Sequence, residues 1–248
     1  MSSSAPLALV TGALGAIGAE CLRQLIATGH RGIALDHPAA ASREAAWRED
    51  PRLAPVPAYF CDLADAAASR ETLTRIEAEQ GPVSVLVNAA GITRDARFSK
   101  MSVEQWRAVL GANLDSAFNA CHPLFPGMCA RGFGRIINLS SVNGQKGQFG
   151  QTNYAASKAG LHGFTMSLAQ EGAACGVTVN TVSPGYVATP MTAAIKPEAL
   201  ERVKAQIPLG RLAEPREIAR VVAFLAEADS AYLTGANIPV NGGLYMSF

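Results

Sequence analysis

The sequence predicts an α/β fold in which one doubly wound parallel sheet of about seven strands carries helices on both faces. Short, almost continuous apolar runs alternate with longer helical patterns, and a glycine-rich turn follows the first run. Near-continuous apolar runs are typical of parallel strands that are covered on both faces. Regular strand–helix alternation then favours a doubly wound sheet over a sandwich or a helical bundle.

The elements follow from these patterns in chain order. Strands are expected over residues 7–10, 32–35, 56–60, 83–87, 135–139, 177–182 and 237–240. Helical patterns lie near residues 17–28, 65–80, 102–130, 153–174 and 215–227. Ligands of such sheets bind beyond the carboxyl ends of the strands, so functional residues are expected directly after the apolar runs.

Composition limits the possible classes of protein. No repeat, linker or change of composition divides the 248 residues, so a single domain over 1–248 is expected, and its 49% hydrophobic residues are sufficient for a large core. The net charge of +1 argues against nucleic acid or a membrane as partner. Five scattered cysteines without C-x-x-C spacing suggest free thiols and no metal site. Apolar runs too short for a signal peptide or a membrane helix suggest a cytoplasmic protein.

The glycine-rich turn connects the first expected strand with the first helix. Gly12, Gly15 and Gly18 recur at every third residue, and Ile17 lies among them. Small residues let the main chain approach a pyrophosphate, whose negative charge is favoured at a helix N-terminus. This turn is therefore expected to bind a dinucleotide, with an ordinary strand–helix turn as the alternative.

Two carboxylates follow the second and third expected strands. Asp36 lies eighteen residues after Gly18, where a carboxylate can accept hydrogen bonds from the adenosine ribose and repel a 2′-phosphate. His37 is the only basic residue beside it, so NAD(H) is expected, with NADP(H) as the alternative. Asp62 is expected either to bind the adenine amino group or to cap the helix over 65–80.

Tyr154 and Lys158 are four residues apart, about one helical turn, so their side chains share a face. A phenol has a pKa near ~10, and a neighbouring cation lowers it. The pair can therefore supply and withdraw a proton near neutral pH, as carbonyl–alcohol redox chemistry requires. The spacing alone is common by chance, but here a glycine turn and the pair Ser140-Ser141 precede it.

With these motifs in this order, the chain resembles the short-chain dehydrogenase/reductases over essentially its full length. The resemblance implies a Rossmann-like fold, an NAD(P) cofactor and a homotetramer. Apolar helical patterns at 102–130 and 153–174 and the apolar end 244–248 also suggest association of subunits. The markers are Thr11-Gly12, Asn88-Ala89-Ala90-Gly91, Asn113, Ser141, Tyr154, Lys158 and Ser183-Pro184-Gly185.

The resemblance also implies the role of each site residue. Tyr154 is the implied general acid/base, and Lys158 lowers its pKa and binds the nicotinamide ribose. Ser141 would bond the substrate carbonyl, and Asn113 would hold a water that passes protons to Lys158. Further implied cofactor contacts are Asn88, Gly91, Pro184, Gly185, Val187 and Thr189. The chain departs from the family pattern at Ala16, where Gly is usual, and at Ala89, where Asn is usual.

The segment 140–154 narrows the resemblance to the acetoacetyl-CoA reductases of polyhydroxybutyrate synthesis, and 91–95, 100–101 and 183–186 fit the same subgroup. This resemblance implies reduction of acetoacetyl-CoA to (R)-3-hydroxybutanoyl-CoA. Two glutamines and a phenylalanine could hold a small β-keto thioester, and basic residues such as Lys100 and Arg94 could pair with CoA phosphates. The expected substrate contacts are Asp95, Lys100, Ser141, Gln148, Phe149, Gln151, Tyr154 and Tyr186.

Three other functions remain open. A 3-oxoacyl-ACP reductase of fatty-acid synthesis would need a basic patch for its acidic carrier, for which Arg94, Arg97, Lys100, Arg107 and Arg131 are candidates. Another NAD-dependent short-chain alcohol or sugar dehydrogenase is disfavoured by the loop 148–151. A nucleotide-sensing regulator without catalysis is disfavoured by the complete set of four implied catalytic residues.

Overall fold

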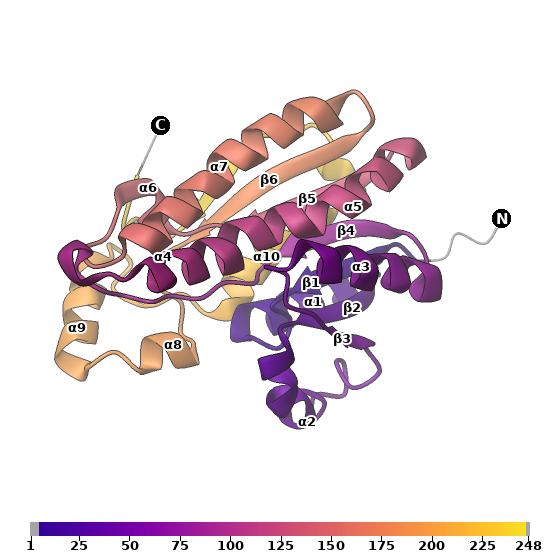
Figure 1. The fold of residues 1–248 in the computed structure, drawn as a ribbon. Helices are drawn as coiled ribbons and strands as arrows, with labels where there is room; N and C mark the ends of the chain where they lie inside the picture. The colour runs from indigo at the N-terminus through magenta and orange to yellow at the C-terminus, as the bar shows by residue number, and fades with distance from the viewer. Residues whose placement is uncertain (1–4, 247–248) are drawn as a thin grey trace.

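The computed structural model describes residues 5–246 and shows one seven-stranded, all-parallel sheet with the strand order β3-β2-β1-β4-β5-β6-β7 (Figure 1). The chain winds outward from β1 to one edge and then from β4 to the other. The predicted fold class is therefore confirmed. The strands are β1 (Leu7–Thr11), β2 (Arg31–Asp36), β3 (Ala58–Phe60), β4 (Val83–Asn88), β5 (Gly134–Leu139), β6 (Val177–Pro184) and β7 (Asn237–Val240).

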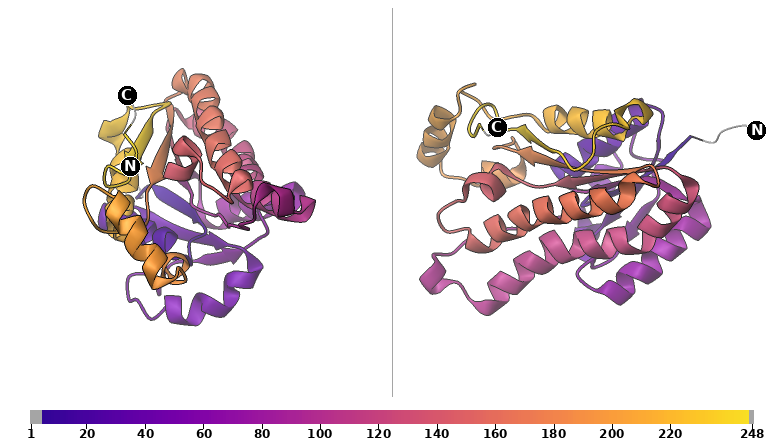
Figure 2. Two further views of the ribbon diagram at one scale, coloured as in Figure 1. Left: turned by 90° about the vertical axis from the view of Figure 1, so that its left-hand side faces the viewer. Right: turned by 90° about the horizontal axis from the view of Figure 1, so that it is seen from above.

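Helices cover both faces of the sheet (Figure 2). One layer contains α1 (Ala16–Ala27) and α10 (Pro215–Ala226), and the other contains α3 (Ala66–Gln80), α5 (Ser116–Arg131) and α7 (Thr152–Ala173). Side chains alternate between the two faces along a strand. In β1, Ala8 and Val10 therefore pack in the core beneath α1 and α10, and Leu7 and Leu9 pack in the core on the other face. Within residues 5–246, no helix is long and apolar enough to cross a membrane.

The third strand is shorter than predicted because two prolines precede it. A strand was expected over 56–60, but β3 begins only at Ala58. Pro55 and Pro57 have no main-chain N–H and cannot donate to a sheet ladder. Val56 instead donates its N–H to the carbonyl of Leu53 at 2.9 Å in a turn, where its side chain is buried.

The helix predicted over 102–130 consists of three segments. α4 (Val103–Leu110) is followed by one π-helical turn, Gly111–Asp115, and then by α5. Such turns widen a helix locally and frequently occur at functional sites. The sequence patterns also missed two short helices whose apolar periodicity is too brief to detect, namely α2 (Glu44–Trp47) and α6 (Val142–Lys146). Two more helices, α8 (Pro190–Ala193) and α9 (Pro197–Gln206), follow β6.

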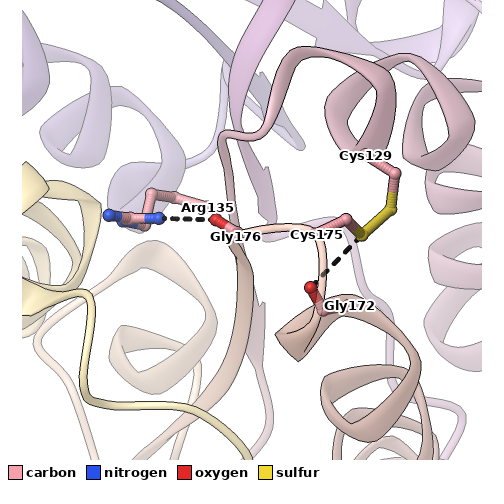
Figure 3. The surroundings of a disulfide bond; sticks show 5 residues. All are labelled: Cys129, Arg135, Gly172, Cys175 and Gly176. Carbon is pink, nitrogen blue, oxygen red and sulfur yellow. Dashed lines mark hydrogen bonds between the residues drawn. A yellow bond between two sulfur atoms is a disulfide. The ribbon is translucent and has the colours of Figure 1, made fainter.

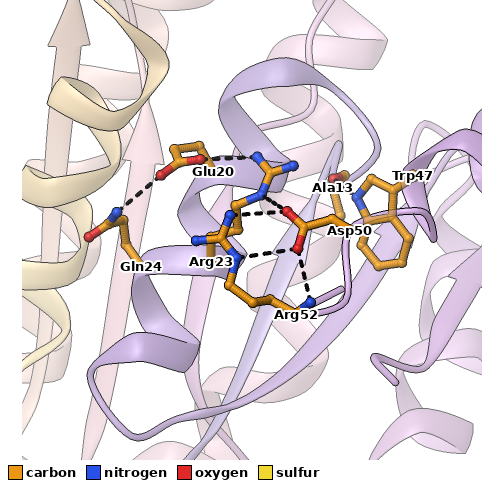
Figure 4. A network of polar contacts seen from close by, with 7 residues as sticks. All are labelled: Ala13, Glu20, Arg23, Gln24, Trp47, Asp50 and Arg52. Carbon is orange, nitrogen blue, oxygen red and sulfur yellow. Dashed lines mark hydrogen bonds and ion pairs between the residues drawn. The ribbon is translucent and has the colours of Figure 1, made fainter. Parts of the chain in front are cut away.

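The segment between β2 and β3 is held against α1 by polar contacts (Figure 4). Asp50 accepts hydrogen bonds from Arg23 Nε at 2.6 Å and from Arg52 Nη2 at 3.1 Å. Arg52 and then Arg23 hold the pKa of Asp50 well below its usual range. Trp47 Nε1 donates to the Ala13 carbonyl at 3.1 Å, so the same segment also fixes the glycine-rich turn.

Cys129 and Cys175 form a disulfide (Figure 3). Cys129 lies in the last turn of α5 and Cys175 between α7 and β6, with their Cα atoms 4.9 Å apart. Strands β5 and β6 are neighbours, so the ends of the helices that precede them meet at one edge of the sheet. The expectation of free thiols is therefore wrong for this pair and confirmed for Cys21, Cys61 and Cys121.

Candidate active site

A cleft of about 1060 Å³ opens at the carboxyl ends of the strands. It is lined by the glycine-rich turn, the ends of β2 and β3, the turn after β4, the start of α6, one face of α7 and the loop after β6. Open α/β sheets bind their ligands at this place. Most predicted cofactor residues line the cleft, namely Gly12, Gly15, Ile17, Gly18, Asp36, Asp62, Gly91, Tyr154, Lys158, Pro184, Gly185, Val187 and Thr189.

The glycine-rich turn needs glycine at two positions. Gly12 has a φ of +63°, and a Cβ there would lie 2.8 Å from the main chain of Ala90. A Cβ on Gly18 would collide with the Gly12 carbonyl oxygen. Ala16, the departure from the family pattern, is the first residue of α1 and has ordinary helical geometry. The turn therefore presents a close main-chain cradle at a helix N-terminus, which fits a dinucleotide pyrophosphate.

Asp36 is almost buried at the end of β2, at 7% exposure. Its carboxylate accepts hydrogen bonds from the Leu14 N–H and the His37 N–H, each at 2.8 Å. The guanidinium of Arg43 lies 3.9 Å from Asp36 Oδ1 and lines the cleft, whereas the His37 ring is 3.8 Å from Asp62. In the sequence, only His37 is adjacent to Asp36, whereas Arg43 is brought back to the cleft by a short helical segment and could not be predicted from spacing.

Asp62 is not the cap of α3. The cap is Asp65, whose side chain accepts hydrogen bonds from the N–H groups of Ala67 and Ala68. Asp62 accepts from the Ala64 N–H at 3.0 Å and remains exposed in the cleft. Of the two alternatives left open for Asp62, the capping role is therefore excluded.

The turn after β4 is organised by Thr11 rather than by its own side chains. Thr11 Oγ1 accepts hydrogen bonds from the N–H groups of Ala89 at 3.1 Å and Ala90 at 3.2 Å. The Asn88 side chain is buried and donates to Asn138 Oδ1 at 2.8 Å, outside the cleft lining. The cofactor contact predicted for the Asn88 side chain is therefore not available in this structure, because Asn88 does not line the cleft.

Asn113 lies in the π-helical turn, directly behind Gly91. Its Oδ1 accepts from the Ile92 N–H at 2.7 Å, and its amide donates to the Ile92 carbonyl and to Ser157 Oγ, both at 3.1 Å. A Cβ on Gly91 would lie 3.2 Å from Asn113 Oδ1 and 3.3 Å from Lys158 Nζ. Asn113 therefore joins three segments behind the cleft and lies next to Lys158.

Tyr154 and Lys158 lie on the face of α7 that lines the cleft, as the four-residue spacing predicts. Lys158 Nζ donates to the Leu139 carbonyl at 2.7 Å, and burial lowers the pKa of Lys158 to about 8. Burial also raises the pKa of Tyr154, with a smaller increase from the Asp95 charge, while a hydrogen bond with Ser141 opposes the shift. Burial therefore sets the net direction of the Tyr154 pKa in this structure, and the lowering of that pKa by Lys158 stays a prediction.

The two serines after β5 have different surroundings. Ser140 Oγ donates to the Lys158 carbonyl at 2.8 Å and so ties β5 to α7. Ser141 Oγ accepts from the Asn143 N–H at 3.1 Å, and Ser141 is the serine that lowers the pKa of Tyr154. Of the pair, Ser141 is thus the one whose hydroxyl proton is available beside the phenol.

The substrate residues predicted from the sequence divide into two groups. Asp95, Ser141, Gln151, Tyr154 and Tyr186 line the cleft together. Lys100, Gln148 and Phe149 do not belong to its lining. The Phe149 side chain is 80% exposed, with the Arg97 guanidinium 5.8 Å from its ring centre.

The five basic residues considered for a carrier patch are also divided. Arg94 and Arg107 line the cleft, and Arg97 and Lys100 are exposed. Arg131 donates to the Val83 carbonyl at 2.6 Å, at the amino end of β4 and so at the opposite edge of the sheet. Arg131 therefore cannot contribute to a patch at the mouth of the cleft.

Comparison with known proteins agrees with this geometry. A family model described as "Enoyl-(Acyl carrier protein) reductase" matches residues 12–245. The chain is 49% identical to "Acetoacetyl-CoA reductase" of Allochromatium vinosum over 98% of this chain and 99% of that one, and 49% identical to the protein of that name from Rhizobium meliloti over 97% and 99%. It is 42% identical to "3-oxoacyl-[acyl-carrier-protein] reductase FabG" of Vibrio cholerae over 99% and 100%. The chain therefore belongs to the short-chain dehydrogenase/reductase family and is an oxidoreductase homologous to 3-oxoacyl reductases.

Proposed function

We propose that the protein is an acetoacetyl-CoA reductase that transfers a hydride from NADH, or less efficiently from NADPH, to the 3-keto group and forms (R)-3-hydroxybutanoyl-CoA. The observation that carries the proposal is one cleft in which Ser141, Tyr154 and Lys158 lie beside Asp95 and Gln151. Similarity of 49% to proteins named acetoacetyl-CoA reductase over almost the whole chain supports the same substrate.

The chain's own residues account for the proton chemistry. When bound, the nicotinamide supplies the hydride to the 3-keto carbon. The hydroxyls of Ser141 and Tyr154 polarise the ketone, and Tyr154 gives its proton to the carbonyl oxygen. The raised pKa of Tyr154 keeps the phenol protonated before the step, which suits a proton donor. Lys158 would hold the ribose of the bound cofactor and would stabilise the phenolate that forms. A water held near Asn113 would then return the proton to Tyr154.

This mechanism predicts a fall in activity at alkaline pH. Lys158 has a pKa of about 8, so its ammonium is charged below that pH and neutral above it. A neutral amine no longer stabilises the phenolate. The kcat/KM for acetoacetyl-CoA reduction should therefore be level below about pH 8 and fall tenfold per pH unit above it.

The control for this pH profile is Lys158→Arg. Its guanidinium stays charged at every pH in the assay. The variant is expected to be slower but to lose the alkaline fall. An unchanged fall in the variant would assign the titration to another group.

The proposed NADH preference rests on Asp36. Its carboxylate would accept hydrogen bonds from the adenosine ribose and repel a 2′-phosphate. Asp36→Ser should lower the ratio of kcat/KM for NADH to that for NADPH about 10- to 100-fold, the usual effect of one charge-assisted hydrogen bond. Arg43, 3.9 Å from this carboxylate, then becomes available to a 2′-phosphate.

Arg43 provides the matching control for the cofactor preference. In the Asp36→Ser background, Arg43→Ala should remove the gain with NADPH and leave the rate with NADH unchanged. Initial rates with both cofactors at saturating acetoacetyl-CoA measure both effects. A natural chain that is faster with NADPH than with NADH would contradict the role assigned to Asp36.

The carrier of the acyl group distinguishes the second candidate function. Arg94 and Arg107 in the cleft and the exposed Arg97 and Lys100 leave an acidic acyl carrier protein as an alternative, and similarity of 42% to a 3-oxoacyl-ACP reductase supports it. The test compares kcat/KM for acetoacetyl-CoA and acetoacetyl-ACP. A higher value for the CoA thioester supports the proposal, and a much higher value for the ACP thioester favours the alternative.

We also propose the homotetramer that the family resemblance implies. Large apolar side chains are about half exposed on two helices of one layer, Phe118 on α5 at 51% and Met166 on α7 at 52%. Apolar side chains exposed on adjacent helices favour association with another protein surface. Light scattering during size-exclusion chromatography measures the mass directly, and a monomer would contradict this proposal.

A further inference from the structure

A chain of hydrogen bonds crosses the substrate side of the cleft from Ser141 to Asp95. The main-chain N–H of Asn143 donates to Ser141 Oγ at 3.1 Å. The side-chain amide of Asn143 donates to Gln151 Oε1 at 2.9 Å, and Gln151 Nε2 donates to Asp95 Oδ2 at 2.8 Å. Three segments that are separate in the sequence are thus connected through Asn143 and Gln151.

The order of donors and acceptors in this series of hydrogen bonds is set by Asp95. A carboxylate can only accept hydrogen bonds, so Gln151 must turn its NH₂ group toward Asp95. Its carbonyl oxygen must then face Asn143, which has to donate. Because Asn143 donates to the carbonyl oxygen of Gln151, both ends of the Gln151 amide have a hydrogen-bond partner in this orientation.

Asn143 is also the rigid end of the chain. It is 8% exposed, whereas Gln151 is half-buried and Asp95 is exposed. It lies on α6, which packs closely against α7, since a Cβ on Gly144 would lie 2.8 Å from the Lys158 carbonyl carbon. The Gln151 amide is therefore held by Asn143, which lies on a helix packed against the part of α7 that carries the proposed catalytic lysine.

We propose that Asn143 is a positioning residue that fixes the Gln151 amide, so that the second N–H of Gln151 is available to the thioester carbonyl of the substrate. The NH₂ group of glutamine has two N–H donors, and Asp95 uses only one. The proposal rests on the proposed function because it concerns a β-keto thioester. Asn143 thereby takes part in substrate recognition without contact with the reacting atoms.

The first variant is Asn143→Asp, which has nearly the same shape. The new carboxylate repels Gln151 Oε1, so Gln151 rotates its NH₂ toward residue 143 and loses Asp95. The KM for acetoacetyl-CoA should rise about tenfold, as expected for one lost hydrogen bond to the substrate. The kcat, the KM for NADH and the melting temperature should be unchanged, which separates positioning from a general structural defect. An unchanged KM for acetoacetyl-CoA overturns the proposal.

The double variant Asp95→Asn with Asn143→Asp tests whether the orientation of the Gln151 amide matters, or only the presence of its two hydrogen bonds. The hydrogen-bond chain can form again with reversed direction, since residue 143 now accepts from Gln151 and residue 95 donates to it. The KM for acetoacetyl-CoA is expected to remain high because the Gln151 amide is inverted. A return of KM to the natural value would show that only connection matters and would overturn the claim about orientation.

Two further variants keep the test decisive. Asn143→Ala removes the donor without adding charge, so it should raise the KM for acetoacetyl-CoA about threefold. If the aspartate variant does not fold, an unchanged KM in Asn143→Ala overturns the proposal.

Gln145→Glu is the control, because it makes the same amide-to-carboxylate change on α6 outside the cleft lining. It should leave the KM for acetoacetyl-CoA unchanged. An equal rise of KM in Gln145→Glu would overturn the proposal. Failure of the proposed function can be distinguished from failure of the role of Asn143, because in the first case the natural protein itself would not reduce acetoacetyl-CoA.

Discussion

Replacing Tyr154 by phenylalanine should lower the kcat for acetoacetyl-CoA reduction by about 10³-fold, in the range that loss of a positioned general acid produces. The phenol is the proposed proton donor, and its raised pKa is consistent with that role. Removal of one oxygen keeps the ring and its packing on α7. Steady-state rates measure the loss, while quenching of protein fluorescence by NADH should show unchanged cofactor binding.

Tyr186 provides the matched control for this prediction. It is a second phenol that lines the same cleft, and burial, with the Asp95 charge, raises its pKa as well. Tyr186→Phe removes one hydroxyl from the cleft without removing the proposed proton donor. Loss of one possible hydrogen bond to the substrate should change kcat/KM by no more than about tenfold. If Tyr186→Phe lost as much activity as Tyr154→Phe, or if Tyr154→Phe remained active, the assignment of the proton donor would be wrong.

Reduction of the Cys129–Cys175 disulfide should lower the free energy of unfolding by about 4 kcal/mol, because the bond closes a long loop in the unfolded chain. The two cysteines are 46 residues apart in sequence. For a chain of this size, that loss corresponds to a fall in melting temperature of about 10 °C. Thermal unfolding with and without dithiothreitol measures it, and kcat should be unchanged because the disulfide lies at the edge of the sheet opposite the cleft.

The control for the disulfide is Cys129→Ser, which should melt at the same temperature with and without dithiothreitol. A count of thiols in the denatured protein gives an independent readout. Three free thiols are expected before reduction, from Cys21, Cys61 and Cys121, and all five after it. Five thiols before reduction would show that the pair is not bonded in solution, and no shift of melting temperature would then be expected.

Much of the fold was predictable because it depends on local burial. The apolar runs that become β1, β4 and β5 are nearly continuous because both faces of these strands are covered. The Tyr154–Lys158 pair was predictable for a similar reason, since a spacing of four residues on a helix fixes a shared face without any tertiary contact. The boundaries of β3 and of the segmented helix before Asn113 were not, because prolines and a π-helical turn interrupt the periodic pattern.

By itself, the sequence determined the strand–helix alternation, the glycine-rich turn and the shared face of Tyr154 and Lys158 on α7, because each depends on residues close together along the chain. Only the tertiary structure decided which distant side chains meet. It brought Arg43 to Asp36, joined Cys129 to Cys175 and connected Asn143 through Gln151 to Asp95. It also decided the direction in which the pKa of Tyr154 shifts, because burial raises it. These properties depend on packing between segments, about which periodicity and spacing along a single chain carry no information.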